Sequence, residues 1–166
     1  MRQRKDAVVV GLGNPLMTDE GIGSYIVQEL AARPEFANYV DFVEQGASPM
    51  SVIHAIARRQ KAVMIDCAYM NQPAGTIRRF TPDEIVNLKV MAPFSLHQGD
   101  LLNALELSLK LGEYPDDVII FGIQPQRVTP GDCLSPALHQ RFVDYVEMIC
   151  AELQAFSSAS RQSSRK

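Results

Sequence analysis

The sequence predicts a single α/β domain, a three-layer sandwich in which helices cover both faces of a mostly parallel sheet. Apolar runs rich in β-branched residues alternate with amphipathic segments at helical spacing. Two of the runs, 7–10 and 62–65, are continuously apolar, as in strands buried on both faces. The alternation spans residues 1–156 without a linker or repeat, and the polar, basic tail 157–166 is predicted to be disordered.

Composition excludes several classes of function. The chain has 166 residues, a hydrophobic content of 46% and a net charge of −3, so it offers no basic field for nucleic acid. No apolar run reaches the length of a membrane span, and MRQRKD leads into the first strand without the pattern of a signal peptide. The 3 cysteines are scattered, which suits a reducing compartment. We therefore expect a cytoplasmic protein with neither a nucleic-acid nor a membrane partner.

The first half is organised around residues 7–23, AVVVGLGNPLMTDEGIG. A strand ends in the turn Gly11-Leu12-Gly13, a polar loop runs over 14–20, and a helix follows with apolar residues at helical spacing. After this helix we expect a strand over 39–43, a turn over 44–47, a helix from Pro49 to about Arg59 capped by Ser48, and a strand over 62–65 that ends at Asp66.

Helix signals organise the second half. Thr81 to Glu84 forms a capping box after a strand over 75–80, and Ser95 to Gln98 reads as a second box. Its helix is predicted to bury Leu101, Leu102, Leu105 and Leu109 and to end at Gly112. A strand over 117–123, a loop over 124–134 and a final helix opened by Ser135 and Pro136, with an apolar stripe through Leu153, complete the domain.

Candidate functional residues gather where the predicted strands end, because ligands bind at the carboxyl edge of such sheets. Asp19 and Glu20 follow the first strand, and their position fits either chemistry or the dipole of the helix N-terminus. Asp66 either projects into the ligand crevice or caps a neighbouring loop. His97 lies at a predicted helix N-terminus, which favours the neutral, metal-binding imidazole. Cys67 should point away from Asp66 and reads as a small buried residue.

Two familiar interpretations of the first turn fit poorly. The dinucleotide fingerprint G-x-G-x-x-G has Leu16 in place of its third glycine, Pro15 stands in the phosphate loop, and the two nearby carboxylates would repel a pyrophosphate. The string GLGNP also opens peptidyl-tRNA hydrolases, but the Arg-His-Asn segment that continues it there is absent here.

The complete segment GLGNPLMTDEGIG resembles the N-terminal signature of the hydrogenase maturation endopeptidases. The segments AVMIDCA, GTIRRFTPDEI, SLHQGDL and FGIQPQRV fall in the family's order and spacing, so the resemblance extends from Val8 to about Phe156. It implies a monomeric peptidase, of the aspartic or metal-recognising type, that removes the C-terminal extension of a nickel–iron hydrogenase large-subunit precursor after nickel insertion. A non-catalytic protein that checks the nickel site of the precursor is the alternative.

The resemblance also implies a ligand set. Glu20, Asp66 and His97 fall on the three positions that bind a divalent metal in the family, and two carboxylates with one imidazole suit nickel or zinc. The nickel would be carried by the precursor, whereas zinc or another divalent ion could bind the isolated protein. The chain departs from the family at Glu44-Gln45-Gly46, where Asp-Gly-Gly is common.

Overall fold

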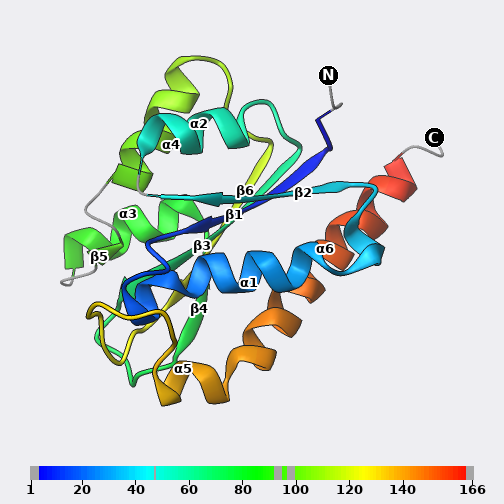
Figure 1. Ribbon diagram of the computed structural model, residues 1–166. Coiled ribbons are helices and arrows are strands. Elements are labelled where there is room, and N and C mark those ends of the chain that lie inside the picture. Colours follow the sequence, from blue (N-terminus) through cyan, green and yellow to red (C-terminus); the bar gives the residue numbers. More distant parts are fainter. Residues whose placement is uncertain (1–3, 47, 92–94, 97–99, 164–166) are drawn as a thin grey trace.

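A parallel sheet forms the centre of the fold, as the computed structural model shows for residues 4–46, 48–91, 95–96 and 100–163 (Figure 1). The strand order is β2-β1-β3-β6-β4. All neighbours along it are parallel except β4, which pairs antiparallel with β6 at the edge, and the short β5 pairs antiparallel with β3. The strands are β1 (Ala7–Leu12), β2 (Val40–Gln45), β3 (Lys61–Tyr69), β4 (Ile77–Phe80), β5 (Ser95–Leu96) and β6 (Asp117–Ile123).

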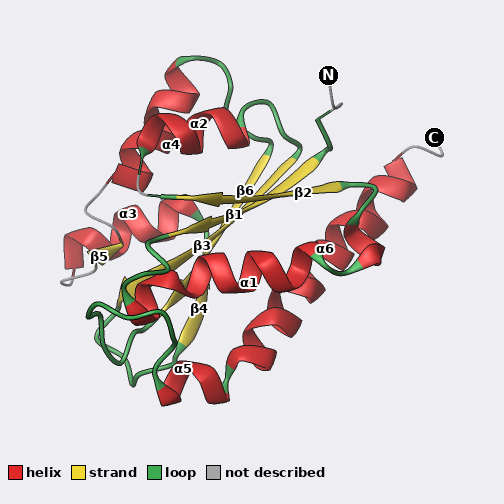
Figure 2. Cartoon of the chain, in the orientation of Figure 1, coloured by secondary structure: helices red, strands yellow, loops and turns green. Residues whose placement is uncertain are grey.

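Helices cover both faces of this sheet, which confirms the predicted three-layer α/β sandwich (Figure 2). Their bounds are α1 (Ile22–Ala31), α2 (Pro49–Ile56), α3 (Pro82–Met91), α4 (Asp100–Lys110), α5 (Pro136–Gln140) and α6 (Phe142–Ser163), with short 3-10 helices η1 (Thr18–Gly21) and η2 (Pro34–Phe36). Apolar side chains of α1, α5 and α6 pack on one face, and those of α2, α3 and α4 pack on the other. None of the described helices is long and apolar enough to span a bilayer.

The order of the strands locates the natural crevice. The chain passes from β1 through α1 to β2 on one side, and then returns through α2 to β3 on the other side of β1. The direction of winding therefore reverses between β1 and β3, and α1 and α2 lie on opposite faces. Crevices that bind ligands form at the carboxyl ends of the strands at such a reversal. The segments that carry Glu20 and Asp66 follow or form these two strand ends.

The predicted termini of several elements are corrected. Strand β3 continues to Tyr69, so Asp66 lies inside the strand rather than at its end, because β6 still pairs with it at Gly122. Glu44 and Gln45 belong to β2 and not to a turn, since β1 pairs with both of them.

The second predicted capping box was wrong, whereas the first is confirmed. Ser95 lies in β5, paired with Tyr69, and α4 begins at Asp100, because the exposed end of β3 offers a backbone partner that the local pattern cannot reveal. Leu109, predicted to be buried, is 63% exposed. At α3 the carboxylate of Glu84 accepts hydrogen bonds from the backbone N–H and the hydroxyl of Thr81, as the sequence predicted.

The C-terminal helix differs from the prediction at both ends. Arg141 separates α5 from α6, so the predicted single helix is broken near its start. The tail predicted to be disordered, 157–166, is helical as far as Ser163, and the residues beyond it lie outside the described part of the chain. Residues 157–163 contain neither glycine nor proline, so nothing in them stops a helix that the core has already formed.

Candidate functional site

Two glycines bring the Glu20-bearing segment onto the ends of β1 and β3. Gly13 has φ +106°, and a Cβ there would collide with the carbonyl oxygen of Glu20. A Cβ on Gly23, near the start of α1, would lie 2.7 Å from the carbonyl oxygen of Ile65 in β3. The close approach of these backbones places η1 in contact with β3. Gly13 and Gly23 therefore set the position of Glu20.

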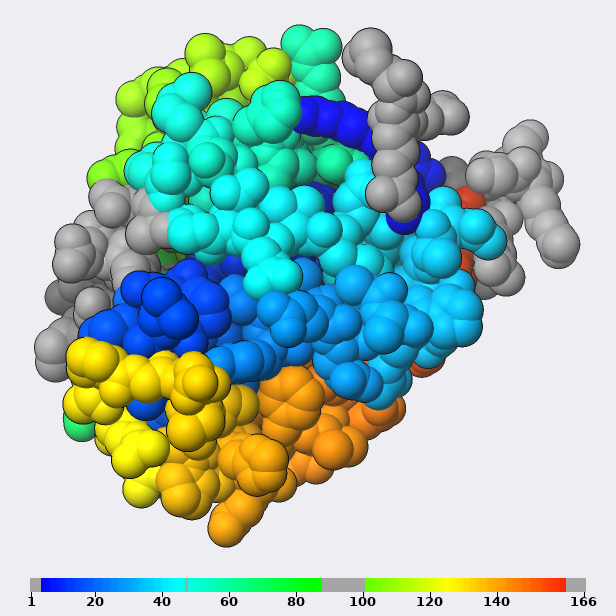
Figure 3. Space-filling view, in the orientation of Figure 1, coloured from blue at the N-terminus to red at the C-terminus, as the bar shows by residue number. Residues whose placement is uncertain are grey.

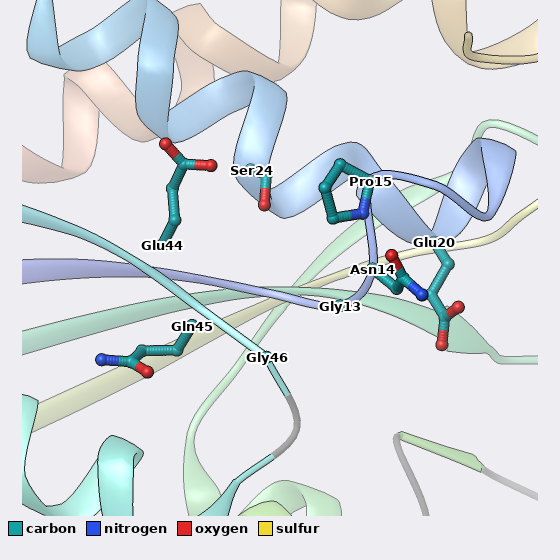
Figure 4. A pocket seen from close by; sticks show the side chains of 8 residues that line it. All are labelled: Gly13, Asn14, Pro15, Glu20, Ser24, Glu44, Gln45 and Gly46. Atoms are coloured by element: carbon teal, nitrogen blue, oxygen red, sulfur yellow. The ribbon is translucent and has the colours of Figure 1, made fainter. Parts of the chain in front are cut away.

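An open pocket of about 590 Å³ lies at this edge of the sheet (Figure 4). Glu20 and Glu44 stand at its two ends, with the backbone of Gly13 and Gly46 between them. The carboxylate of Glu44 turns toward α1, where Gln28 Nε2 donates a hydrogen bond of 3.1 Å to Glu44 Oε2. The complete lining is Gly13, Asn14, Pro15, Glu20, Ser24, Glu44, Gln45 and Gly46.

Asp66 is fully buried in β3. Because strand side chains alternate, it shares the sheet face of Met64 and Ala68, which pack with α2 and α4, whereas Cys67 faces the α1 and α6 layer. The pairing of β1 with β3 ends at Gly11 and Ile65, so Asp66 lies where β3 extends beyond β1. Asp66 therefore lies within the strand, and it is not among the residues that line the pocket.

The carboxylates of this edge act on Cys67. Burial raises the pKa of the Cys67 thiol, and the nearby carboxylates of Asp66, Asp19 and Glu20 raise it further. The thiol is therefore protonated at neutral pH, as expected for a small buried residue and not for a nucleophile. The shared effect also indicates that three carboxylates lie within electrostatic reach of one point.

Asp19 and Glu20 have different environments despite being neighbours in sequence. Asp19 is fully buried and accepts hydrogen bonds from the backbone N–H groups of Gln126, Arg127 and Ser135 and from the Ser135 hydroxyl, at 2.7–3.0 Å. Glu20 is partly exposed and lines the pocket. The structure thus separates the two acids that the sequence presented together.

The third predicted ligand, His97, lies outside the described residues. Its chain neighbour Leu96 pairs with Ala68, two residues beyond Asp66. Within the described ranges, no three His, Cys, Asp or Glu side chains form a complete metal site. The ligand set Glu20, Asp66 and His97 therefore remains a prediction.

Sequence reasoning missed the polar side chains of α1 that border the pocket. Ser24 lines it, and Gln28, one helical turn later, holds Glu44. The available signal was the spacing of four residues on a helix that begins at the site. The loop over 124–134, by contrast, contributes no residue to the lining of this pocket.

Comparison with known proteins gives a consistent result. The family model for hydrogenase maturation proteases matches residues 24–152. HupD, a hydrogenase expression/formation protein of Thiocapsa roseopersicina, is 28% identical over 163 residues, which cover 98% of this chain and 74% of that protein. The hydrogenase 2 maturation protease of Escherichia coli is 29% identical over 150 residues, 89% of this chain and 90% of that protein.

Solved structures agree in fold. The hydrogenase maturating endopeptidase HybD from E. coli superposes with a TM-score of 0.76 at 27% identity, over 90% of this chain and 92% of that one. The [NiFe] hydrogenase maturation protease HybD of Thermococcus kodakarensis has a TM-score of 0.71 at 24% identity, over 89% of this chain and 97% of that one, and supports the fold. The chain therefore belongs to the hydrogenase maturation protease family, and its role is that of an endopeptidase in hydrogenase maturation.

Proposed function

We propose that this endopeptidase removes the C-terminal extension of a nickel–iron hydrogenase large-subunit precursor after nickel has been inserted. The observation that carries the proposal is the open pocket, lined by Glu20, at the carboxyl ends of β1 and β2, next to the point where the winding of the sheet reverses. An open pocket at a sheet edge can admit an extended segment of a polypeptide. The family to which the chain belongs supplies the class of reaction.

Glu20, Asp66 and His97 are proposed to bind the nickel that the precursor carries, or zinc or another divalent ion in the isolated protein. The chemistry of the donors fits, because carboxylate oxygens and an imidazole nitrogen suit borderline divalent ions. Asp66 and Glu20 both act on the Cys67 thiol, whose pKa is raised by burial and then by Asp66, Asp19 and Glu20, so the two proposed carboxylate ligands lie near one point of the structure. Three protein ligands leave further coordination positions for groups of the substrate.

Glu20, Asp66 and His97 are also the proposed catalytic residues, and either a metal-polarised water or a water activated by a carboxylate base would attack the peptide. The pocket is lined by carboxylates, amides and one serine, and its described lining includes neither cysteine nor histidine. This composition favours a carboxylate-based, metal-recognising peptidase over a cysteine peptidase. We further expect the enzyme to act as a monomer in the cytoplasm.

The proposal is tested most directly by asking whether cleavage depends on metal bound to the precursor, a dependence that we call gating. An incomplete ligand set binds the productive complex tightly only when the precursor supplies the ion. A coupling of about 3 kcal/mol would correspond to roughly a hundred-fold preference for loaded precursor. Without such gating, the pocket would accept any accessible chain.

The experiment compares nickel-loaded with nickel-free precursor on a denaturing gel. We expect the wild-type protein to shorten only the loaded precursor, and Glu20→Gln and Asp66→Asn to fold but leave it uncut. Equal shortening of both precursors would refute the gating. Binding without shortening would instead establish the non-catalytic checkpoint.

A further inference from the structure

Asp19 precedes Glu20 in the chain and does not line the pocket, but it accepts several hydrogen bonds. Both oxygens of the buried Asp19 carboxylate accept hydrogen bonds from the loop that follows β6. Oδ1 accepts from the Ser135 backbone at 2.7 Å. Oδ2 accepts from the backbone N–H groups of Gln126 and Arg127 and from the Ser135 hydroxyl, at 2.9, 3.0 and 2.7 Å. The carboxylate is thus satisfied by groups more than 100 residues away in sequence.

Further bonds attach the same loop to the same segment. Thr18 Oγ1 donates to the carbonyl of Arg127 at 3.0 Å and accepts from the N–H of Thr129 at 3.1 Å. Gly131 exchanges backbone hydrogen bonds with the segment, donating to Leu16 and accepting from Thr18, both at 2.9 Å. This loop therefore acts as a brace on 14–20, whereas the pocket wall formed by Glu44 and its neighbours lies on the opposite side.

The brace determines the direction of Glu20. Asp19 and Glu20 are consecutive residues of η1, a 3-10 helix with about three residues per turn, so their side chains diverge by about 120°. When Asp19 is held against the loop after β6, Glu20 must project elsewhere, and it projects into the pocket. Rotation of η1 that turned Glu20 out of the pocket would break the hydrogen bonds of Asp19.

We infer that Asp19 is a positioning residue, which fixes the Glu20 carboxylate in the pocket by anchoring η1 to the loop over 126–135. The inference rests on the proposed role of Glu20 in cleavage. It is distinct from a role in general stability because it concerns the geometry of one neighbouring side chain. An asparagine has nearly the same shape, but its NH₂ group cannot accept the hydrogen bonds that one carboxylate oxygen now receives.

The test measures steady-state cleavage of nickel-loaded precursor by Asp19→Asn over a range of precursor concentrations, normalised to folded protein. We expect kcat to fall at least tenfold while KM changes less than twofold, because the precursor still binds but Glu20 is misdirected. The matched control is Glu152→Gln, which disturbs a polar network at the amino edge of the sheet and should retain wild-type kcat. Wild-type kcat in folded Asp19→Asn would overturn the inference.

A second variant and a second readout keep the result decisive. Ser135→Ala removes one hydroxyl donor and leaves three backbone donors, so it should fold and lower kcat about threefold; an unchanged kcat would contradict the inference even if Asp19→Asn does not fold. Amide hydrogen exchange gives an activity-independent measure. In either variant the Glu20 amide, bonded to the Met17 carbonyl at 3.1 Å, should lose protection while β1 keeps it. If the wild-type protein does not cleave, the proposed function fails, and the exchange at Glu20 alone decides the positioning role.

Discussion

The acidic residues at the two edges of the sheet have different kinds of partner. At the amino edge, the ammonium of Lys61, whose side chain is 5% exposed, lies between Asp117 and Glu152, and Arg79 also binds Glu152 at 2.7 Å. Arg59, equally buried, binds Asp41 at 2.6 Å. Asp41, Asp117 and Glu152 are thus each paired with a cation that the fold itself supplies. These acids stabilise the structure.

At the carboxyl edge several acidic residues lie close to one another. Asp19, Glu20 and Asp66 together raise the pKa of Cys67 beyond the effect of its burial, and burial and Glu20 also contribute to the raised pKa of Tyr69. Asp19 is satisfied by neutral donors instead of a cation. The carboxylates of this edge therefore act together on the groups around them. We therefore propose that one edge maintains the fold and that the other serves the reaction. Figure 3 shows the segment after β6 (yellow) packed against the segment of η1 and α1 (blue).

The largest expected effect is a difference between one variant at each edge, of which one should lose stability and the other should lose cleavage. Lys61→Met should lower the free energy of unfolding by about 2 kcal/mol, less than the roughly 3–5 kcal/mol of a fully buried pair because Asp117 is half exposed and Glu152 keeps Arg79. Its cleavage of loaded precursor, per folded molecule, should be unchanged. Glu20→Gln should do the opposite, with stability within about 0.5 kcal/mol of wild type and no cleavage.

Urea denaturation and the gel assay on both variants measure this crossed pattern. Loss of cleavage in folded Lys61→Met would show that the amino edge also serves the reaction. A large loss of stability in Glu20→Gln would show that the carboxyl edge holds the fold together. Either result would remove the distinction between the edges.

The sequence predicted this division only in part. The strand, glycine turn and helix over 7–30 were readable because local spacing and turn chemistry determine them. The sequence placed Asp66 at the end of a buried strand, whereas β3 continues to Tyr69 and it is only the pairing with β1 that ends at Ile65. The partners of Asp19 could not be predicted, because they lie on a loop over 100 residues later whose path depends on the whole sheet. Short-range patterns likewise mistook β5 for a helix start, since its partner is the end of β3.

A second, smaller effect is expected in the pH dependence of stability. The hydrogen bond from Arg79, followed by that from Lys61, lowers the pKa of Glu152 below its ordinary 4.5 despite its burial. Burial acts to raise the pKa of Asp41, but the hydrogen bonds from Arg59 and the Lys5 backbone outweigh it and lower the value below 3.8. A lowered pKa means that the unfolded chain binds the proton more readily. The stabilisation is therefore complete above about pH 4.5 and is lost as the pH falls through the folded-state values.

Thermal unfolding between pH 3 and 7 tests this edge separately from the site. Glu152→Gln should flatten the acid side of the stability profile and lower the plateau. A profile for Glu152→Gln that retains the full wild-type slope would assign the acid sensitivity to other carboxylates.

The smallest effect concerns the space for a side chain at Gly46, in the wall of the pocket at the carboxyl edge. The departure Glu44-Gln45-Gly46 suggests a strained glycine, but Gly46 does not have the left-handed φ seen at Gly13, and a Cβ on it would meet no atom within 4 Å. A side chain at position 46 is therefore not expected to clash with its surroundings.

Gly46→Ala should leave both stability and cleavage close to wild type. Gly46→Val should fold as well but lower the cleavage rate about threefold, because its branched side chain enters the pocket between Gly13 and Glu44. Normal stability with slower cleavage in the valine variant alone would show that this wall contacts the precursor. Equal rates in both variants would place the path of the precursor elsewhere along the edge, and a loss of stability in Gly46→Ala would show that this wall, like the amino edge, is part of the packed structure.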